Sequence, residues 1–475
     1  MDLVVGVDSS TQATKVEIRF VEDGRPHFRG SHPHPPVTPP TAEQDPESWW
    51  RAYEDIFKNA MASDLDGPLA AISVAGQQHG CVVTDASGVP LRPAKLWNDT
   101  TTAPDAAWLV DQLPAGAAGW AQACGSVPVA AFTISKLSWL HRTEPELWSR
   151  VERVCLPHDW ITWRLSGELV TDRGDASGTG YWSPSEERYR TDLLEIVDDS
   201  LDWAPMLPRV LGPIEMAGQR LGAVVGPGTG DNMAAALGLG IEPGDVVISL
   251  GTSGTVSCLS SHATADPSGS IAGFADANGA FLPLACTLNA TKVTDTVAGL
   301  LGVDLARLDL LARHAEPGAG GLTLLPYLDG ERTPNRPTAT GVLAGLRTDA
   351  QPEQVARAAV EGVVCGLLDG LDALRAHVPD AGSGRLFLTG GGARSAAYRQ
   401  VLADLAQREV TTTDLEQTVA TGACVQAAAV LTGRDPAEVR AEWDIASLGE
   451  TEPSIDAAIA EDVRSRYAAR RDREA

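Results

Sequence analysis

The sequence predicts an α/β protein of two domains, because each half of the chain opens with the same strand–turn–strand unit. The chain has 475 residues, which is too long for one ordinary hydrophobic core. Near its N-terminus, "LVVGVDSSTQATKVEIRF" places a short apolar strand before a polar turn and an alternating second strand. The segment "DVVISLGTSGTVSCL", residues 245–259, repeats that order in mid-chain. We therefore expect one domain over residues 1–240 and a second over residues 241–475.

Both turns are rich in small residues. In the first unit, residues 9–12 follow an apolar strand over residues 4–7; in the second, residues 251–254 follow a strand over residues 246–250. Such turns offer backbone N–H groups and hydroxyls, which suit phosphate oxygens. One turn alone is weak evidence. Two turns, each heading one half of a long chain, indicate duplicated domains with two phosphate-binding hairpins across a cleft.

The remaining segments mix strand and helix patterns. Residues 352–378 have helical periodicity with a proline near the start, and residues 384–410 read as a strand, a Gly-rich loop and a helix. This mixture predicts domains in which helices cover mixed sheets.

Composition excludes several classes of function. The formal net charge of −26 argues against nucleic acid or an anionic membrane as the main partner. The seven cysteines are scattered without a C-x-x-C pair, so we expect neither a zinc site nor a disulfide framework. The start of the chain lacks a basic region of the secretory kind, and no apolar run approaches the length of a membrane span. We expect a cytoplasmic protein.

Nucleotide binding cannot use a Walker loop, because no lysine follows a glycine. Asp8 ends the first strand, where a carboxylate can hold Mg²⁺ through water. The alternative, a phospho-aspartate nucleophile, requires a second Asp two residues later, and this chain has Ser10 there. In "TGGGARS", Gly391 and Gly392 allow a backbone to approach a ligand closely.

Asp231 is a single acidic residue between a Gly-rich turn and the expected start of a helix. It lies in "VVGPGTGDNMAAALGLG", after a Gly-rich turn and before an Ala-rich helical run. The start of a helix supplies N–H donors and partial positive charge that favour an incoming phosphate. The residues alone leave two interpretations open: Asp231 caps this helix, or it acts as a base beside a phosphate.

Eight motifs, in order along the chain, resemble those of the FGGY carbohydrate kinases. They are "GVDSSTQATK", "EQDPESWW", "VAGQQHG", "LWND", "GTGDN", "SLGTSGT", "PYLDGERTP" and "LTGGGARS". The resemblance extends from the first strand to about residue 430. It implies two domains of the actin, hexokinase and Hsp70 type (ribonuclease H-like) that flank a cleft, with the sugar deep inside and ATP above it.

The resemblance also implies roles for individual residues. Asp231 would be the catalytic base that takes the proton from the sugar hydroxyl, and Asp8 would hold Mg²⁺ through water. The sugar would contact Asp231 and four residues of the first domain: Gln78, His79, Trp97 and Asn98. ATP would contact the two hairpins and the Gly-rich loop through Thr11, Lys15, Gly251, Thr252, Gly391 and Gly392.

The activity implied is ATP-dependent phosphorylation of D-xylulose to D-xylulose 5-phosphate. Family members often carry Met-His where this chain has Gln78-His79, which keeps kinases of D-ribulose, L-ribulose, glycerol, L-fuculose and rhamnulose as alternatives. A sugar sensor without turnover and an Hsp70-like ATPase module are rivals from other classes. We expect Glu331 and Arg332 to form a structural salt bridge, and we assign no role to Lys292. The resemblance also allows a homodimer.

Overall fold

The first lobe is built on a seven-stranded mixed sheet. The computed structural model describes residues 1–413, 417–443 and 447–473. The strand order is β13-β14-β5-β1-β2-β3, and β15 pairs with β5. The strands are β1 (Leu3–Ser9), β2 (Ala13–Phe20), β3 (Pro26–Pro33), β5 (Leu69–Gly76), β13 (Gly218–Arg220), β14 (Ala223–Val225) and β15 (Thr229–Gly230).

The hairpin of β1 and β2 forms as its sequence pattern predicts. Every residue of β1 is buried, and β2 begins with alternating burial before it enters the core. The N–H of Ser10 donates to the carbonyl of Ala13 (3.0 Å) and closes the turn. The antiparallel register places Asp8 opposite Lys15, and β5 lies parallel to β1 on its other side. The hairpin therefore carries its polar residues at the carboxyl end of β1.

The second lobe has its own seven-stranded sheet, in the order β18-β19-β17-β16-β22-β23-β24. β16 and β17 form the second hairpin, closed by the N–H of Gly251 donating to the carbonyl of Ser253 (3.0 Å). The strands are β16 (Val246–Leu250), β17 (Gly254–Cys258), β18 (Ile271–Ala275), β19 (Phe281–Thr287), β22 (Leu386–Thr389), β23 (Val410–Thr413) and β24 (Ser447–Thr451).

Helices cover both sheets, and short strands pair with one another in small two-stranded sheets outside the two large ones. In the first lobe the helices are α1 (Pro46–Ala62), α2 (Ala103–Gln112), α3 (Gly116–Cys124), α4 (Thr133–Thr143), α5 (Pro145–Trp148), α6 (Pro157–Ser166), α7 (Arg173–Ala176), α8 (Thr191–Leu194) and α9 (Asp231–Leu239). Later in the chain they are α10 (Thr291–Leu301), α11 (Leu305–His314), α12 (Pro352–Arg375), α13 (Ala396–Ala406), α14 (Thr418–Thr432), α15 (Pro436–Glu442) and α16 (Ala457–Arg473). The short strands are β4 (Glu43–Gln44), β6 (Val82–Thr84), β7 (Ala94–Lys95), β8 (Arg153–Cys155), β9 (Val170–Asp172), β10 (Trp182–Ser183), β11 (Arg188–Tyr189), β12 (Arg209–Leu211), β20 (Thr323–Leu325) and β21 (Val342–Ala344).

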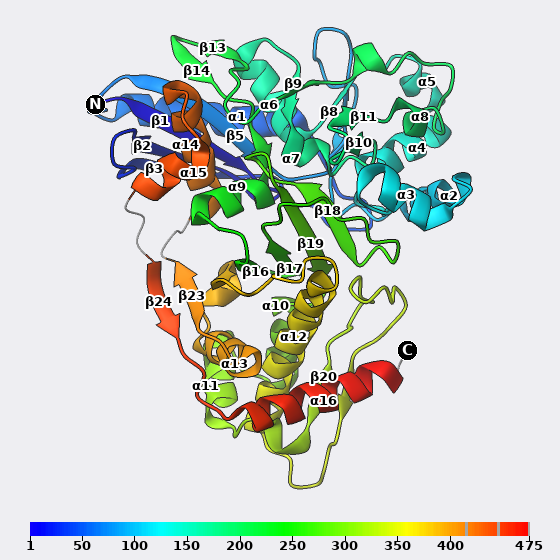
Figure 1. Cartoon of the computed structure of the whole chain (residues 1–475), viewed down its shortest axis with the longest axis vertical. Helices are drawn as coiled ribbons and strands as arrows, with labels where there is room; N and C mark the ends of the chain where they lie inside the picture. Colours follow the sequence, from blue (N-terminus) through cyan, green and yellow to red (C-terminus); the bar gives the residue numbers. More distant parts are fainter. Residues whose placement is uncertain (414–416, 444–446, 474–475) are drawn as a thin grey trace.

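Two segments cross between the lobes (Figure 1). Between β23 and β24 the chain leaves the second sheet, and there α14 packs against β1, β5 and α9 of the first lobe. In the other direction, β18 inserts Phe274 into a buried cluster with Phe132 and Trp120 of the first lobe. The predicted boundary at residues 240/241 falls in the link from α9 to β16 and stays a prediction.

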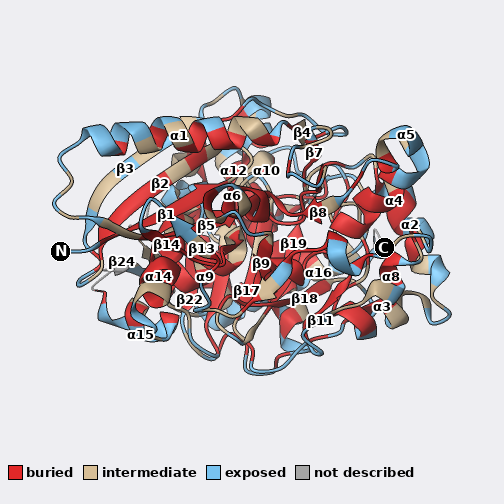
Figure 2. Cartoon of the chain, turned by 90° about the horizontal axis from the view of Figure 1, so that it is seen from above, coloured by how far each residue is buried: buried red, intermediate tan, exposed pale blue. Residues whose placement is uncertain are grey.

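Buried residues concentrate in the central strands and in the inner faces of the helices, while the outer face of α1 is exposed (Figure 2). All seven cysteines are free and buried. Across the described ranges, no helix is both long enough and apolar enough to cross a membrane.

Candidate active site

Asp231 is the first residue of α9 and directly follows β15. The N-cap of α9 is Gly230, which follows the end of β15, so Asp231 is not the cap that one interpretation of the sequence expected. The Oδ1 of Asp231 accepts two hydrogen bonds from Asn232: one from the backbone N–H (2.8 Å) and one from the side-chain amide (3.1 Å). Burial, together with the nearby carboxylates of Asp8 and Asp175, raises the pKa of Asp231 to about 7. Such a group can take up a proton near neutral pH.

Asp8 lies at the carboxyl end of β1 and is almost completely buried. Its Oδ2 accepts a hydrogen bond from Nζ of Lys15 (3.2 Å), while its Oδ1 is buried and has no partner among the described residues. Burial raises the pKa of Asp8, and Lys15 opposes that rise. Buried carboxylate oxygens are normally satisfied, so an unpartnered one indicates that a donor or a cation is missing from this position.

Gln78 is held next to the base. Its Oε1 accepts a hydrogen bond from the side-chain amide of Asn232 (2.7 Å), so the residue after Asp231 fixes the orientation of Gln78. The Oδ1 of Asn98 is buried and has no partner in the described parts of the chain, and the Nε2 of Gln78, also buried, lies near the carboxylate of Asp175. These two amide groups fit a ligand that offers both donors and acceptors, as a polyol does.

His79 has a defined tautomer and a fixed ring. Its Nδ1 donates to the carbonyl of Gly178 (2.8 Å), which leaves Nε2 as an acceptor. The ring packs between Phe132 (centroids 5.0 Å apart) and Phe274 (5.4 Å), and the second of these comes from the other lobe. Burial, with the charges of Lys136 and Arg332, lowers the pKa of His79 to about 3. His79 is therefore neutral at physiological pH.

Trp97 and Thr11 join the predicted sugar loop to the first predicted phosphate hairpin. The indole N–H of Trp97 donates to Oγ1 of Thr11 (3.0 Å), and this hydroxyl donates to Oε1 of Gln77 (2.9 Å). Asp99, which follows this loop, is fully buried and accepts the backbone N–H of Ala42 (2.9 Å). Asp99 thus anchors the loop.

The ATP-binding residues predicted in the second lobe form a separate cluster. The N–H groups of Ala290 and Thr291, at the start of α10, donate to the carbonyls of Thr252 (3.1 Å) and Gly251 (2.9 Å). A Cβ at Gly392 would lie 2.5 Å from the side chain of Leu250, whereas a Cβ at Gly391 would meet nothing within 4 Å. The Gly-rich loop therefore packs on the hairpin strand at one glycine and presents open backbone at the next. No hydrogen bond or ion pair between described residues joins this cluster to that of the first lobe.

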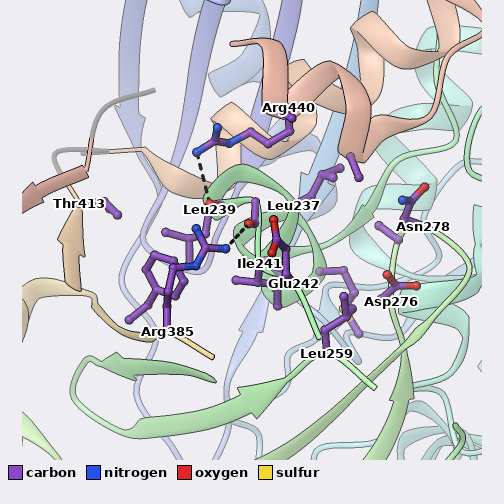
Figure 3. A pocket seen from close by; sticks show the side chains of 17 residues that line it. Leu237, Leu239, Ile241, Glu242, Leu259, Asp276, Asn278, Arg385, Thr413 and Arg440 are labelled. Carbon is purple, nitrogen blue, oxygen red and sulfur yellow. Dashed lines mark hydrogen bonds between the residues drawn. The ribbon is translucent and has the colours of Figure 1, made fainter. Parts of the chain in front are cut away.

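The far end of α9 is held by two arginines. Arg440 of α15 donates to the carbonyls of Gly238 (2.7 Å) and Leu239 (3.2 Å), and Arg385 donates to that of Gly240 (2.9 Å). Figure 3 shows both side chains beside a cavity of about 350 Å³ at the link between the lobes. This cavity lies at the opposite end of α9 from Asp231, so we place the chemistry elsewhere. The two arginines satisfy the last carbonyls of the helix that carries Asp231.

One expectation about the second lobe is wrong. Glu331 and Arg332 form no salt bridge; the carboxylate of Glu331 instead accepts hydrogen bonds from Leu288, Asn289 and the backbone N–H of Arg332. Two backbone N–H groups and one side-chain amide satisfy the buried carboxylate of Glu331 in place of a cation. Lys292, which received no role, pairs with the exposed Asp329 (3.1 Å).

Sequence reasoning missed three contributors to the site. Asn232 was detectable, because it follows Asp231 directly in "GTGDN". Phe132 and Phe274 were not, since each resembles any other aromatic core residue until the fold places it against His79.

A two-lobed α/β fold, with a carboxylate at a helix start and two small-residue hairpins, is compatible with a sugar kinase. The models of the N-terminal and C-terminal domains of the FGGY family of carbohydrate kinases match residues 3–238 and 246–431. The chain belongs to this family, which confirms the predicted fold class.

The relatives are more specific. The xylulose kinase of Streptomyces coelicolor is 47% identical over 454 residues, which cover 94% of this chain and 91% of the relative. The xylulose kinase of Streptomyces rubiginosus is equally similar, at 47% identity over the same shares of both chains. The crystal structure of xylulose kinase from Bifidobacterium adolescentis superposes with a TM-score of 0.87 at 38% identity and covers 99% of both chains.

Proposed function

We propose that this protein transfers the γ-phosphoryl group of ATP to the terminal hydroxyl of D-xylulose, giving D-xylulose 5-phosphate, ADP and a proton. The observation that carries the proposal is Asp231, a carboxylate with a raised pKa at the start of a helix and near Asp8, whose Oδ1 has no partner among the described residues. The 47% identity to xylulose kinases supports the choice of sugar.

Asp231 acts as the general base. It accepts the proton of the sugar hydroxyl as that oxygen bonds to the γ-phosphorus, while the bond from phosphorus to the β–γ bridging oxygen breaks and ADP leaves. A positioned base of this kind contributes roughly 10² to 10⁴ in rate. The N–H groups at the start of α9 favour the negative charge of the transferring group. Positioning and charge neutralisation supply the rest.

Four residues of the first lobe hold the sugar. His79 can only accept a hydrogen bond at Nε2, so it requires a hydroxyl that donates. Gln78, oriented by Asn232, and Asn98 offer amide groups, and Trp97 presents an indole held by Thr11. Because every polar group in such a site needs a partner, a sugar that lacks one hydroxyl leaves a buried group unpaired and binds less well.

Mg²⁺ fits Asp8. The unpartnered Oδ1 is an oxygen ligand of the kind that Mg²⁺ takes, directly or through water, while Lys15 holds Oδ2. The described residues contain no group of three or more His, Cys, Asp and Glu that could hold a metal, so Asp8 would share the ion with phosphate oxygens. When bound, the ion neutralises charge on the phosphates. Thr11 and Lys15 in the first lobe, and Gly251, Thr252, Gly391 and Gly392 in the second, would hold the nucleotide.

The pH profile tests the base. An aspartate base works only when deprotonated, so activity is lost as the pH falls through its pKa. With D-xylulose and Mg-ATP both well below their KM values, we expect the rate to fall about tenfold per pH unit below a pKa of about 7. The rate under these conditions reports the free enzyme, in which neither sugar nor Mg-ATP lies beside Asp231. An acid limb at the ordinary aspartate value of 3.8 would contradict the environment described for Asp231.

The substrate is tested by ADP release with Mg-ATP and one sugar at a time: D-xylulose, D-ribulose, L-ribulose, glycerol or none. We expect the highest kcat/KM with D-xylulose. A higher value with another polyol would keep the kinase mechanism and refute the assignment of the sugar to Gln78, His79, Trp97 and Asn98. No sugar-dependent release with any of them would refute the kinase and favour a sensor.

A further inference from the structure

Glu331 is a buried carboxylate that the proposed mechanism does not use. It lies between β20 and β21 with 3% of its surface exposed. Its Oε1 accepts the backbone N–H groups of Leu288 (2.6 Å) and Arg332 (2.8 Å), and its Oε2 accepts the side-chain amide of Asn289 (2.9 Å). Among described residues, no lysine or arginine pairs with it. A buried carboxylate without a counter-ion is costly, so its hydrogen bonds have to be well made.

The partners of Glu331 lead directly to the second hairpin. Leu288 and Asn289 are the first two residues of the link between β19 and α10. The next two N–H groups, of Ala290 and Thr291, donate to the carbonyls of Thr252 (3.1 Å) and Gly251 (2.9 Å) in the hairpin turn. The carboxylate of Glu331 thus holds Leu288 and Asn289, and the next two residues of the chain hold the turn through backbone hydrogen bonds.

Asn289 reinforces the same link. Its amide also donates to the carbonyl of Gly330 (2.7 Å), and its Oδ1 accepts the N–H of Leu328 (3.2 Å). The loop around Glu331 and the 288–289 link are thus joined on both sides. With the hydrogen bonds of Asn289 and Glu331 satisfied together, the link has one orientation, and so do the N–H groups that hold the hairpin turn.

We propose that Glu331 is a positioning residue for nucleotide binding, fixing through Leu288 and Asn289 the turn at Gly251 and Thr252 that receives the phosphates of ATP. This proposal rests on the proposed function, because it takes the turn to be a phosphate site. A purely structural carboxylate would change stability alone. Replacing a positioning carboxylate changes the affinity for nucleotide but leaves the affinity for sugar unchanged, because the sugar binds in the other lobe.

The chain offers a matched control in Glu361. This residue of α12 lies in the same lobe, is 4% exposed, and pairs with Arg357 (2.7 Å) while accepting the N–H of Gly318 (2.8 Å). Within the described ranges, no hydrogen bond or ion pair joins Arg357 or Gly318 to the hairpin. Glu361→Gln should therefore reproduce the loss of stability that comes from altering a buried carboxylate, without the change at the phosphate turn.

The test measures two dissociation constants for each full-length protein by calorimetry, with Mg²⁺ and the non-hydrolysable analogue AMP-PNP, and separately with D-xylulose. In Glu331→Gln, an amide replaces one acceptor oxygen, so a donor faces Asn289 or Leu288. We expect the Kd for AMP-PNP to rise about tenfold, the effect of losing one hydrogen bond to a charged group. The Kd for D-xylulose should stay within about twofold, and Glu361→Gln should leave both constants near wild type.

If Glu331→Gln does not fold, Asn289→Ala serves instead, since it removes the amide and keeps the bond from Leu288 to Glu331. The proposal is overturned if the variant binds AMP-PNP as wild type does, if both constants rise equally, or if Glu361→Gln shows the same nucleotide defect. A wild type that binds no nucleotide would overturn the proposed function as well. A wild type that binds and turns over, beside an unaffected Glu331→Gln, would overturn the role of Glu331 alone.

Discussion

Replacing Asp231 with asparagine is expected to lower kcat by at least about a hundredfold while sugar and nucleotide still bind. Asparagine keeps the size of the side chain and an oxygen acceptor. It can therefore keep the hydrogen bond that Asp231 accepts from the N–H of Asn232 (2.8 Å) in the wild type. It cannot take up the proton of the sugar hydroxyl. The measurements are the steady-state rate of ADP release and the calorimetric Kd of D-xylulose.

The control for this variant is Asp304→Asn. Asp304 also stands at a helix start, where it caps α11 and accepts the N–H of Arg307 (2.7 Å), and asparagine caps nearly as well. Its kcat should equal that of the wild type. Near-normal turnover in Asp231→Asn, with an unchanged melting temperature, would refute the assignment of the base.

Replacing Gly422 with alanine should impair both stability and turnover. Gly422 lies on α14 at its contact with α9, and a Cβ there would be 1.8 Å from the carbonyl oxygen of Ala234. The backbone of α9 must move to make room. Overpacking of this kind costs typically about 1–3 kcal/mol in the free energy of unfolding.

Turnover should fall because α14 contacts both elements that carry the catalytic carboxylates. α14 packs on β1, which carries Asp8, and on α9, which carries Asp231. A Cβ at Gly6 in β1 would likewise lie 2.1 Å from the carbonyl oxygen of Ala420, so the contact is close on both faces of α14. This helix therefore sets the spacing of the two carboxylates. A displacement of about 1 Å at reacting groups can cost about 10²-fold in rate, and we expect a loss of that order in kcat.

The matched control for Gly422→Ala is Gly299→Ala on α10, where a Cβ would meet nothing within 4 Å. There the substitution should stabilise the protein by up to about 1 kcal/mol, because alanine has the higher helix propensity. Urea unfolding and kcat are measured for both variants. A Gly422→Ala protein with the stability and turnover of the wild type would contradict the spacing role of α14.

Local patterns predicted the hairpins well. The expected strand over residues 246–250 is β16 residue for residue, and the expected strand over residues 4–7 lies inside β1. Alternating hydrophobicity and a turn of small residues are signals carried by neighbours in the chain, so they can be recognised from sequence. Asn232, Gln78 and Asp231 were likewise within reach, because each lies in a short motif.

Contacts between distant segments were not predictable in this way. Phe274 meets His79, and α14 lies against β1, across long separations in sequence and between the lobes. Nothing local distinguishes Gly422 from other glycines of an Ala-rich helix. The raised pKa of Asp231 also depends on Asp8 and Asp175, which the fold brings near it.

The most direct test of the account is the product formed by the wild-type protein from Mg-ATP and D-xylulose. We predict a single new phosphate ester on carbon 5, identified by phosphorus–proton correlation NMR, with one ADP released for each ester formed. Phosphate on another carbon would contradict the placement of the sugar beside Asp231. Release of inorganic phosphate in place of an ester would contradict the transfer itself.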